Sequence, residues 1–226
     1  MKLCIFSDVH GNDAALEAML AAEEGRCDTF VFAGDIFGYF YGQEAIIDRM
    51  MELKNLIAVR GNHEQYYLSR ADREALTDRY GSSYMTVLNE PRRQFLERLP
   101  VSAEAEADGK KLLVLHGDPE DPLEGRVYPD TAPDTIRNTH CDYLILGHTH
   151  YRMARSVGSC LVINPGSLGQ PRDGNGCSYC VLDTSDDSYV FRTVPVNPRD
   201  LLGEVRASDG AHSVYNYLMS HPTMRR

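Results

Sequence analysis

Short apolar runs rich in β-branched residues recur along the chain, and each ends at a cluster of polar residues. Runs this short fit buried strands better than helices. Between the first three runs lie two longer patterns, at 13–24 and 43–54, whose apolar residues share one face, as in amphipathic helices. The predicted strands are 3–6, 29–33, 56–59, 111–115, 143–146, 160–163, 178–182 and 189–194.

The order of these elements predicts the fold class. Strands alternating with helices at the start of the chain indicate a parallel sheet with crossover helices. After residue 110 the strands follow one another closely, which favours a second, mostly meander-like sheet packed on the first. Residues 64–99 predict two rim helices with breaks near Gly81 and Pro91, and 198–226 predicts one or two short helices. We expect a single domain over 1–226 with a flexible tail at about 220–226.

Composition narrows the function. The chain has 226 residues, of which 42% are apolar and 25% charged, as in globular proteins. Its net charge of -10 disfavours binding to extended nucleic acid, because phosphate contacts require a basic surface. No apolar stretch is long enough to span a membrane, and the first residues lack the features of a signal peptide. We therefore expect a cytoplasmic protein without a membrane partner, of unknown oligomeric state.

Six cysteines are present, and Cys177 and Cys180 have the C-x-x-C spacing of zinc and redox sites. A zinc site needs a second such pair, which the chain lacks. A redox pair precedes a helix, whereas this pair leads into a predicted strand. Burial as small apolar residues is the favoured interpretation, and a disulfide framework is not expected.

The chemistry lies where the predicted strands end. Five runs are followed at once by short motifs of Asp, His, Asn and Gly. These are Asp8-Val9-His10, Gly34-Asp35, Gly61-Asn62-His63-Glu64, His116-Gly117 and Gly147-His148-Thr149-His150. Since ligands bind at the carboxyl ends of strands in open α/β sheets, we expect these side chains to meet at one edge. Carboxylate, imidazole and amide oxygen together bind divalent transition metals such as Mn, Fe or Zn.

This series of motifs resembles that of the calcineurin-like metallophosphoesterases, whose blocks D-x-H, G-D, G-N-H-[DE], H-G and G-H-x-H all occur here in order. The resemblance continues into 164–173, as in the small bacterial and archaeal branch. It implies an α/β fold of four layers (αββα), with two mixed sheets face to face and helices outside. It also implies a metal-dependent phosphoesterase that acts on phosphodiesters or small phosphomonoesters.

The resemblance further implies which residues hold two divalent ions (Mn, Fe, Zn, Ni or Co). One ion would be held by Asp8, His10, Asp35 and His150, and the other by Asp35, Asn62, His116 and His148. Such a pair clamps phosphate oxygens and lowers the pKa of a shared water, so that hydroxide attacks phosphorus. His63 is not a ligand in this assignment. As a neighbour of Asn62 it is a candidate general acid for the leaving group, and orientation of a ligand is the alternative.

One block departs from the protein-phosphatase branch of the family, which reads G-D-x-x-D-R-G. Here Gly38 stands in place of the second Asp, which orients the catalytic histidine, and Tyr39 replaces the Arg. The departure weakens an assignment as a phosphoprotein phosphatase. Glu64 or Asp118 could orient His63 instead.

Two other functions compete with the enzyme. The same fold serves as a non-catalytic scaffold, for example in a sorting-coat subunit, but a scaffold is free to lose ligands and here every ligand position is filled. A nuclease would require a basic groove or a capping domain, and this acidic chain predicts neither.

The loop 166–174 supplies the last candidate. It follows the predicted strand 160–163, next in sequence after the strand that leads to His148, so we expect it near the same edge. Arg172 is its one cation, and a guanidinium matches two phosphate oxygens. Arg172 and Asn12 are therefore predicted to position the phosphate of a small ester substrate. The alternative is that Arg172 pairs with Asp173 or another surface carboxylate and merely orders the loop.

Overall fold

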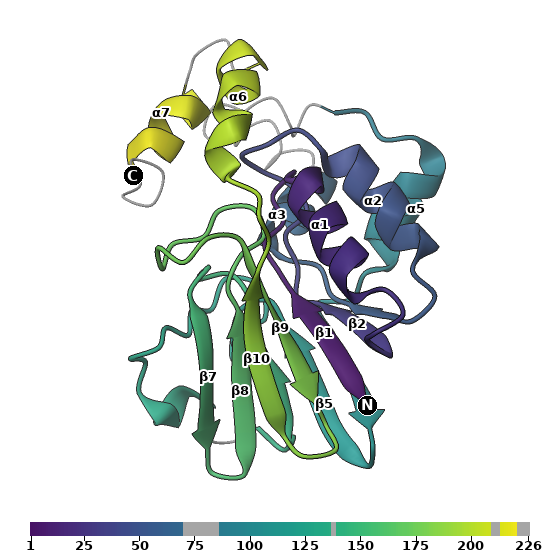
Figure 1. The fold of residues 1–226 in the computed structure, drawn as a ribbon, viewed down its shortest axis with the longest axis vertical. Helices are drawn as coiled ribbons and strands as arrows, with labels where there is room; N and C mark the ends of the chain where they lie inside the picture. The colour runs from purple at the N-terminus through teal and green to yellow at the C-terminus, as the bar shows by residue number, and fades with distance from the viewer. Residues whose placement is uncertain (70–85, 137–138, 209–212, 221–226) are drawn as a thin grey trace.

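The computed structural model describes residues 1–69, 86–136, 139–208 and 213–220. Two mixed five-stranded sheets flanked by helices form the molecule, which confirms the predicted fold class (Figure 1). The first sheet runs from edge to edge as β10 (Ser188–Thr193), β9 (Ser178–Asp183), β1 (Lys2–Phe6), β2 (Thr29–Phe32) and β3 (Leu56–Ala58). The second runs as β4 (Ser102–Ala107), β5 (Lys110–Leu115), β6 (Tyr143–Ile145), β8 (Cys160–Pro165) and β7 (Arg152–Val157).

The start of the chain forms the predicted alternation of strands and helices. β1, β2 and β3 are parallel, and the crossover helices α1 (Asp13–Glu23) and α2 (Gln43–Glu52) join them. The apolar faces of these helices bury Leu16, Leu20, Ile47 and Met50 in one core with Phe6 and Phe32 of the sheet. This burial fixes the carboxyl ends of the three strands relative to one another.

The rim segment begins with α3 (Asn62–Leu68) and ends with α5 (Glu90–Arg98), which packs beside α2 (Figure 1). Pro91 does not break a helix as expected, because it lies in the first turn of α5, where no intrahelical bond needs its missing N–H. The break expected at Gly81 falls in 70–85, outside the described residues.

Two features of the sheets differ from the prediction. β9 returns to the first sheet and pairs antiparallel with β1, and β10 follows it at the edge, so neither extends the second sheet. The centre of the second sheet, β5, β6 and β8, is parallel and not a meander. Its edges β4 and β7 lack a continuous apolar run, because an edge strand with one buried face alternates polar and apolar residues, as in SAEAEA.

The main packing layer lies between the two sheets. Leu3 and Ile5 of β1 meet Val114, Ile145 and Ile163 of the second sheet, since alternate residues of a strand face opposite sides. On the outer face of the second sheet, Val127 and Ile136 cover a further apolar cluster, the latter from the short 3₁₀ helix η2 (Pro133–Ile136).

The C-x-x-C pair is buried, as the favoured interpretation predicts. Cys177 joins the core under the helices, whereas Cys180 joins the core between the sheets. The two thiols therefore lie on opposite faces of the sheet. All six cysteines are free thiols.

The end of the described chain forms three short helices, η3 (Pro198–Leu201), α6 (Leu202–Ser208) and α7 (Ser213–Ser220). Figure 1 shows α6 and α7 at the end of the molecule toward which β1 points. The expected tail, apart from Ser220, lies outside the described residues, and the assignment of 1–226 to one domain stays a prediction. Across the described ranges, every helix is too short or too polar to cross a bilayer.

Candidate metal centre

The structure brings all seven predicted metal ligands to one end of the sheets. They are Asp8 and His10 after β1, Asp35 after β2, Asn62 at the start of α3, His116 after β5, and His148 and His150 after β6. Each is buried, with at most 9% of its surface exposed. Ligand atoms lie within 4.8 Å of one another in a first group, Asp8, His10 and His150, and in a second group, Asp35, His116 and His148. A third set, His10, Asp35 and His63, meets the same distance and overlaps both groups.

The backbone of these ligands adopts a rare conformation. Five of them, Asp8, His10, Asp35, His148 and His150, have φ between 49° and 72°. This left-handed region costs a residue other than glycine about 1–3 kcal/mol and persists where the surrounding structure enforces it, typically at functional sites. Backbone bonds such as Asp8 N–H to the Gly34 carbonyl at 2.9 Å enforce it here.

Three imidazoles are oriented by backbone carbonyl groups. Nδ1 of His10, His116 and His150 lies 2.6, 2.7 and 2.7 Å from the carbonyl oxygens of Phe37, Ala33 and Gln170. Because a carbonyl oxygen only accepts, each Nδ1 carries a proton and each neutral ring keeps a lone pair on Nε2. Metal-binding histidines are held in this way.

In the first group, acceptors face one another. Nε2 of His10 is 3.0 Å from Nε2 of His150, which is 3.1 Å from Oδ1 of Asp8. Within the described chain this buried carboxylate oxygen has no hydrogen-bond donor. Ligand atoms bound to one ion at about 2.0–2.1 Å lie about 3.0–3.4 Å from each other. The spacing therefore fits a shared cation better than a hydrogen-bonded network.

The second group is built around Nε2 of His116. Oδ1 of Asn62, Nδ1 of His148 and Oδ2 of Asp35 lie 3.0, 3.1 and 3.2 Å from this atom. The same Oδ2 of Asp35 is 3.8 Å from Nε2 of His10, so one carboxylate oxygen faces both groups.

The orientation of His148 differs from that of the other three. It turns Nδ1 into the site, and its Nε2 lies 3.1 Å from Nε of Arg126, which donates to it. Sequence analysis missed Arg126, because it lies in an irregular loop without a motif.

Burial and neighbouring charges set the protonation of the cluster. Burial lowers the pKa of His10 and His150, and burial with the charge of His116 lowers that of His148 to about 3. Burial raises the pKa of Asp35 to about 7. Against the effect of burial, the Asp35 carboxylate raises the pKa of His116 to about 10. These raised pKa values favour a proton between Asp35 and His116, and a bound cation would displace it.

His63 lies beside the cluster at the start of α3. Its backbone N–H donates to Oδ1 of Asp35 at 3.0 Å, and its ring centroid is 4.8 Å from that of His10. The ring also fills the space above Gly38, where a Cβ would lie 2.5 Å from Nδ1 of His63. Contact with this ring explains why a glycine, with φ of 93°, stands where the phosphatase branch has aspartate.

Glu64 has a role that the sequence did not indicate. Its buried carboxylate accepts four backbone N–H groups, those of Asp35, Ile36, Phe37 and Gly61, at 2.6–3.3 Å. Asp118, the other residue considered for orienting His63, accepts the N–H groups of its own turn. Glu64 thus ties the loop of Asp35 to the start of α3.

The loop that contains Arg172 lies against the first group, as expected. The Arg172 backbone donates to the His150 carbonyl at 3.3 Å, and its Nη2 donates to Oε1 of Gln170 and the hydroxyl of Tyr39 at 3.1 and 3.4 Å. Asp173 instead pairs with Arg152 at 2.8 Å, so the alternative pairing for Arg172 is absent from the described residues.

Asn12 is engaged in local structure. Its Oδ1 accepts from the Ala15 backbone at 3.1 Å and caps α1, and its Nδ2 donates to the Leu168 carbonyl at 3.0 Å. The same Nδ2 also donates to Sγ of Cys177 at 3.8 Å, so a phosphate oxygen would have to replace one of its two acceptors. Its predicted role at the phosphate stays a prediction.

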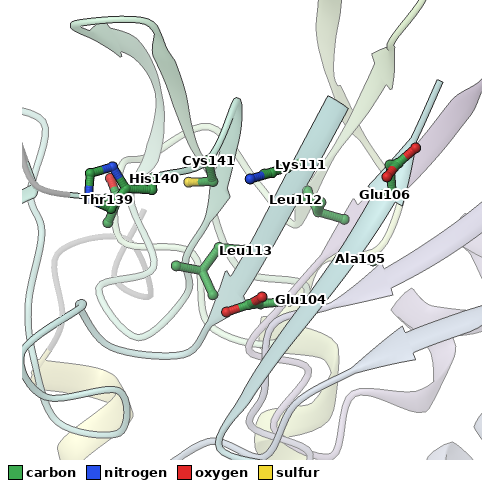
Figure 2. Close-up of a pocket in the computed structure, with 9 residues that line it drawn as sticks. All are labelled: Glu104, Ala105, Glu106, Lys111, Leu112, Leu113, Thr139, His140 and Cys141. Atoms are coloured by element: carbon green, nitrogen blue, oxygen red, sulfur yellow. The ribbon is translucent and has the colours of Figure 1, made fainter. Parts of the chain in front are cut away.

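A separate cavity of about 630 Å³ opens beside β4 and β5 (Figure 2). Glu104, Glu106, Lys111 and residues 139–141 are among its lining. None of the candidate ligands lines it, so it is not part of the metal centre.

The two mixed sheets thus bring Asp, His and Asn side chains to one edge, in groups that could hold metal ions. The calcineurin-like phosphoesterase superfamily domain matches residues 1–187. The chain belongs to this superfamily and is a hydrolytic phosphoesterase, which confirms the resemblance drawn from the motifs.

Similar proteins cover most of the chain. An uncharacterised protein of Methanocaldococcus jannaschii is 31% identical over 206 residues, which are 81% of this chain and 83% of that protein. Phosphodiesterase YfcE of Escherichia coli K12 is 29% identical over 216 residues, 88% of this chain and 100% of YfcE. The crystal structure of a metallophosphoesterase from Sphaerobacter thermophilus superimposes with a TM-score of 0.78 at 27% identity, over 98% of this chain and 100% of that one.

Proposed function

We propose that this phosphoesterase hydrolyses phosphodiesters or small phosphomonoesters at a centre of two divalent transition metal ions (Mn, Fe, Zn, Ni or Co). The observation that carries the proposal is the convergence of carboxylate, imidazole and amide ligand atoms in two buried sets. One carboxylate oxygen, Oδ2 of Asp35, faces both sets. Asp35 would therefore bridge the ions. Asp8, His10 and His150 would complete one site, and Asn62, His116 and His148 the other.

In the proposed reaction, the ions and the side chains have different roles. When bound, the ions supply Lewis acidity and a hydroxide nucleophile near neutral pH. His63 would donate a proton to the leaving oxygen, since its ring lies beside Asp35 and His10 without being needed as a ligand. Burial lowers the pKa of His63, so the negative charge of a bound ester would have to raise it again for the ring to carry that proton. The Arg172 guanidinium binds a phosphate oxygen, because its buried Nε has no acceptor among the described residues. Diesters are included because the similar YfcE is named a phosphodiesterase.

Elemental analysis combined with a turnover screen tests the metal centre. The purified protein is reconstituted with Mn, Fe, Co, Ni or Zn and assayed on aryl phosphomonoesters, aryl phosphodiesters, cyclic nucleotides and dinucleotides. We expect close to two ions per chain and activity that chelator abolishes. Stoichiometric metal without turnover of any ester class would contradict the proposed reaction, and a single ion at full activity would contradict the bridged pair.

The His63→Ala variant tests the general acid. We expect kcat to fall by about 10²–10⁴ for esters with poor leaving groups, with both ions retained. The loss should shrink for nitrophenyl esters, whose leaving group needs no proton. His140→Ala, at an exposed histidine outside the cluster, is the matched control and should behave as wild type. An equal loss for all leaving groups would exclude the acid role.

A further inference from the structure

The helices α6 and α7 pack on the loop that follows Asp35. Tyr39 and Phe40 of this loop form a small buried cluster with Val205, Val214 and Leu218 of the two helices. This cluster is separate from the cores that hold the sheets together. The helices also lie beyond residue 187, where the superfamily match ends, so the matched domain does not account for them.

An aromatic pair connects α7 to the metal centre. The rings of Tyr217 and Tyr39 are stacked, with centroids 5.6 Å apart and planes inclined by 6°. The Tyr39 centroid in turn lies 4.7 Å from that of His10 and 5.9 Å from that of His63. A single ring therefore separates α7 from a candidate ligand and from the proposed acid.

The loop beneath the pair is firmly held. Tyr39 is 3% exposed and has φ of 66°, a conformation that a bulky residue keeps only where its surroundings enforce it. The Phe40 and Gly42 amides donate to the carbonyls of His10 and Gly11 at 3.0 and 2.9 Å. The loop thus stays with the ligands, and a group that needs room has to move α7.

We infer that α6 and α7 form a cap over the His10 and His63 side of the metal centre, and that Tyr217 limits the size of the organic group on the ester. The inference rests on the proposed function. Because Tyr39 stays in place, a compact group ends short of Tyr217, whereas a larger group that extends along Tyr39 meets Tyr217 and has to displace it from the cluster that the two helices share with the loop. The cap therefore selects compact phosphate esters.

A series of phosphodiesters that release the same nitrophenolate tests the selection. The retained group grows from methyl to phenyl to thymidine, so the chemical step stays alike while the size changes. We expect the wild type to prefer the methyl ester. In Tyr217→Ala, the ratio of kcat/KM for the methyl ester to that for the thymidine ester should fall by about tenfold or more. Tyr217→Phe keeps the stacked ring and should keep the wild-type preference. An unchanged preference in Tyr217→Ala would overturn the inference.

A second measurement does not depend on turnover. Full-length protein loaded with manganese is mixed with excess chelator, and the release of the ion is followed in time. Since the cap covers the centre, Tyr217→Ala should release manganese several-fold faster than the wild type. Tyr189→Ala, which removes an exposed tyrosine on β10, is the matched control and should release it at the wild-type rate.

The two measurements separate the inference from the proposed function. If metal-loaded wild type hydrolyses none of the esters, the proposed function is wrong. The release rates alone then test whether α6 and α7 cover the metal centre. Faster release from Tyr217→Ala then supports the cap, and equal rates overturn it. If the esters are hydrolysed with the same preference by both proteins, the function stands and the cap as a size filter is wrong.

Discussion

The two halves of the candidate metal centre come from similar strand ends but are built differently. In the first half, Asp8, His10 and His150 are at most 2% exposed, and carbonyl groups orient both imidazoles. In the second half, Asn62 and His148 are 5% and 9% exposed, and Asn62 offers an uncharged oxygen. Oriented and charged ligands bind a cation more tightly, so we expect the first half to retain its ion longer.

The contact between Arg126 and His148 widens this difference. Arg126 donates to Nε2 of His148, which places the proton of the neutral ring on Nδ1, the nitrogen that faces the other ligands. Binding of an ion through Nδ1 requires that this proton move to Nε2 and that the bond from Arg126 break. The second half therefore rearranges when it binds, whereas the first half already presents its lone pairs.

Replacing Asp35 should remove the difference altogether, because its carboxylate faces both halves. We expect Asp35→Asn to lose both ions and to lower kcat/KM by more than about 10³. Removal of a single transition-state contact costs at most about that much. Elemental analysis and steady-state kinetics measure the two effects. Wild-type metal content with a wild-type rate would show that Asp35 does not bridge.

A pair of histidine variants tests the comparison directly. His148→Ala should leave one tightly held ion in the first half, whereas His150→Ala should weaken that ion and leave only the more exchangeable one. Both should lower kcat/KM by about 10²–10³, since each removes an ion from the reaction. Calorimetric titration of each variant with metal measures the affinity of the ion that remains. The opposite order of affinities would invert the assignment of the tighter site.

Gly38→Ala should separate the position of His63 from metal binding. The added Cβ would meet the His63 ring at 2.5 Å, so we expect kcat to fall by about 10², within the range for lost acid–base help, with both ions retained. Gly109→Ala is a matched control, because Gly109 also has positive φ, 77°, but open space around it. Both variants should lose stability, and only Gly38→Ala should lose activity. Equal kinetics in the two would remove Gly38 as a positioning residue.

The smallest effect is expected at Arg172, beside the first half. Arg172→Ala should cost about 1.5–3 kcal/mol in kcat/KM, the value of a charge-assisted contact, without change in metal content. Arg152→Ala is the control in the same region, because Arg152 pairs with Asp173 and lies over the Phe191 ring, and it contacts none of the candidate ligands in these interactions. It should lower the melting temperature and spare the kinetics. If Arg172→Ala behaves in the same way, Arg172 has a structural role.

The cluster of candidate ligands was predictable because short stretches of sequence show where its residues lie. Each candidate ligand directly follows an apolar run or begins the next helix, and strand ends in such sheets meet at one edge. The fold class followed from the same alternation. The edge strands β4 and β7 could not be found in this way, because Ala103 and Ala105 alternate with serine and glutamate and form no apolar run.

Other features depend on contacts between distant segments. The pairing of β9 with β1 is specified by packing and not by a turn, so no neighbouring residues reveal it. The sequence showed that Gly38 replaces an aspartate, but only the structure shows that the ring of His63 occupies that space. The same holds for the stacking of Tyr217 on Tyr39.

The position of β9 has a consequence for biosynthesis. Ribosomes deliver the amino-terminal segments first, so β1 and β2 emerge long before β9, which covers the other side of β1. The loop before β9 arrives equally late, and it carries the Ser167 hydroxyl and the Gly169 amide that bind the Asp8 carbonyl. The carbonyl of Asp8, the first candidate metal ligand in the chain, therefore gains these two contacts only after the loop before β9 has been translated.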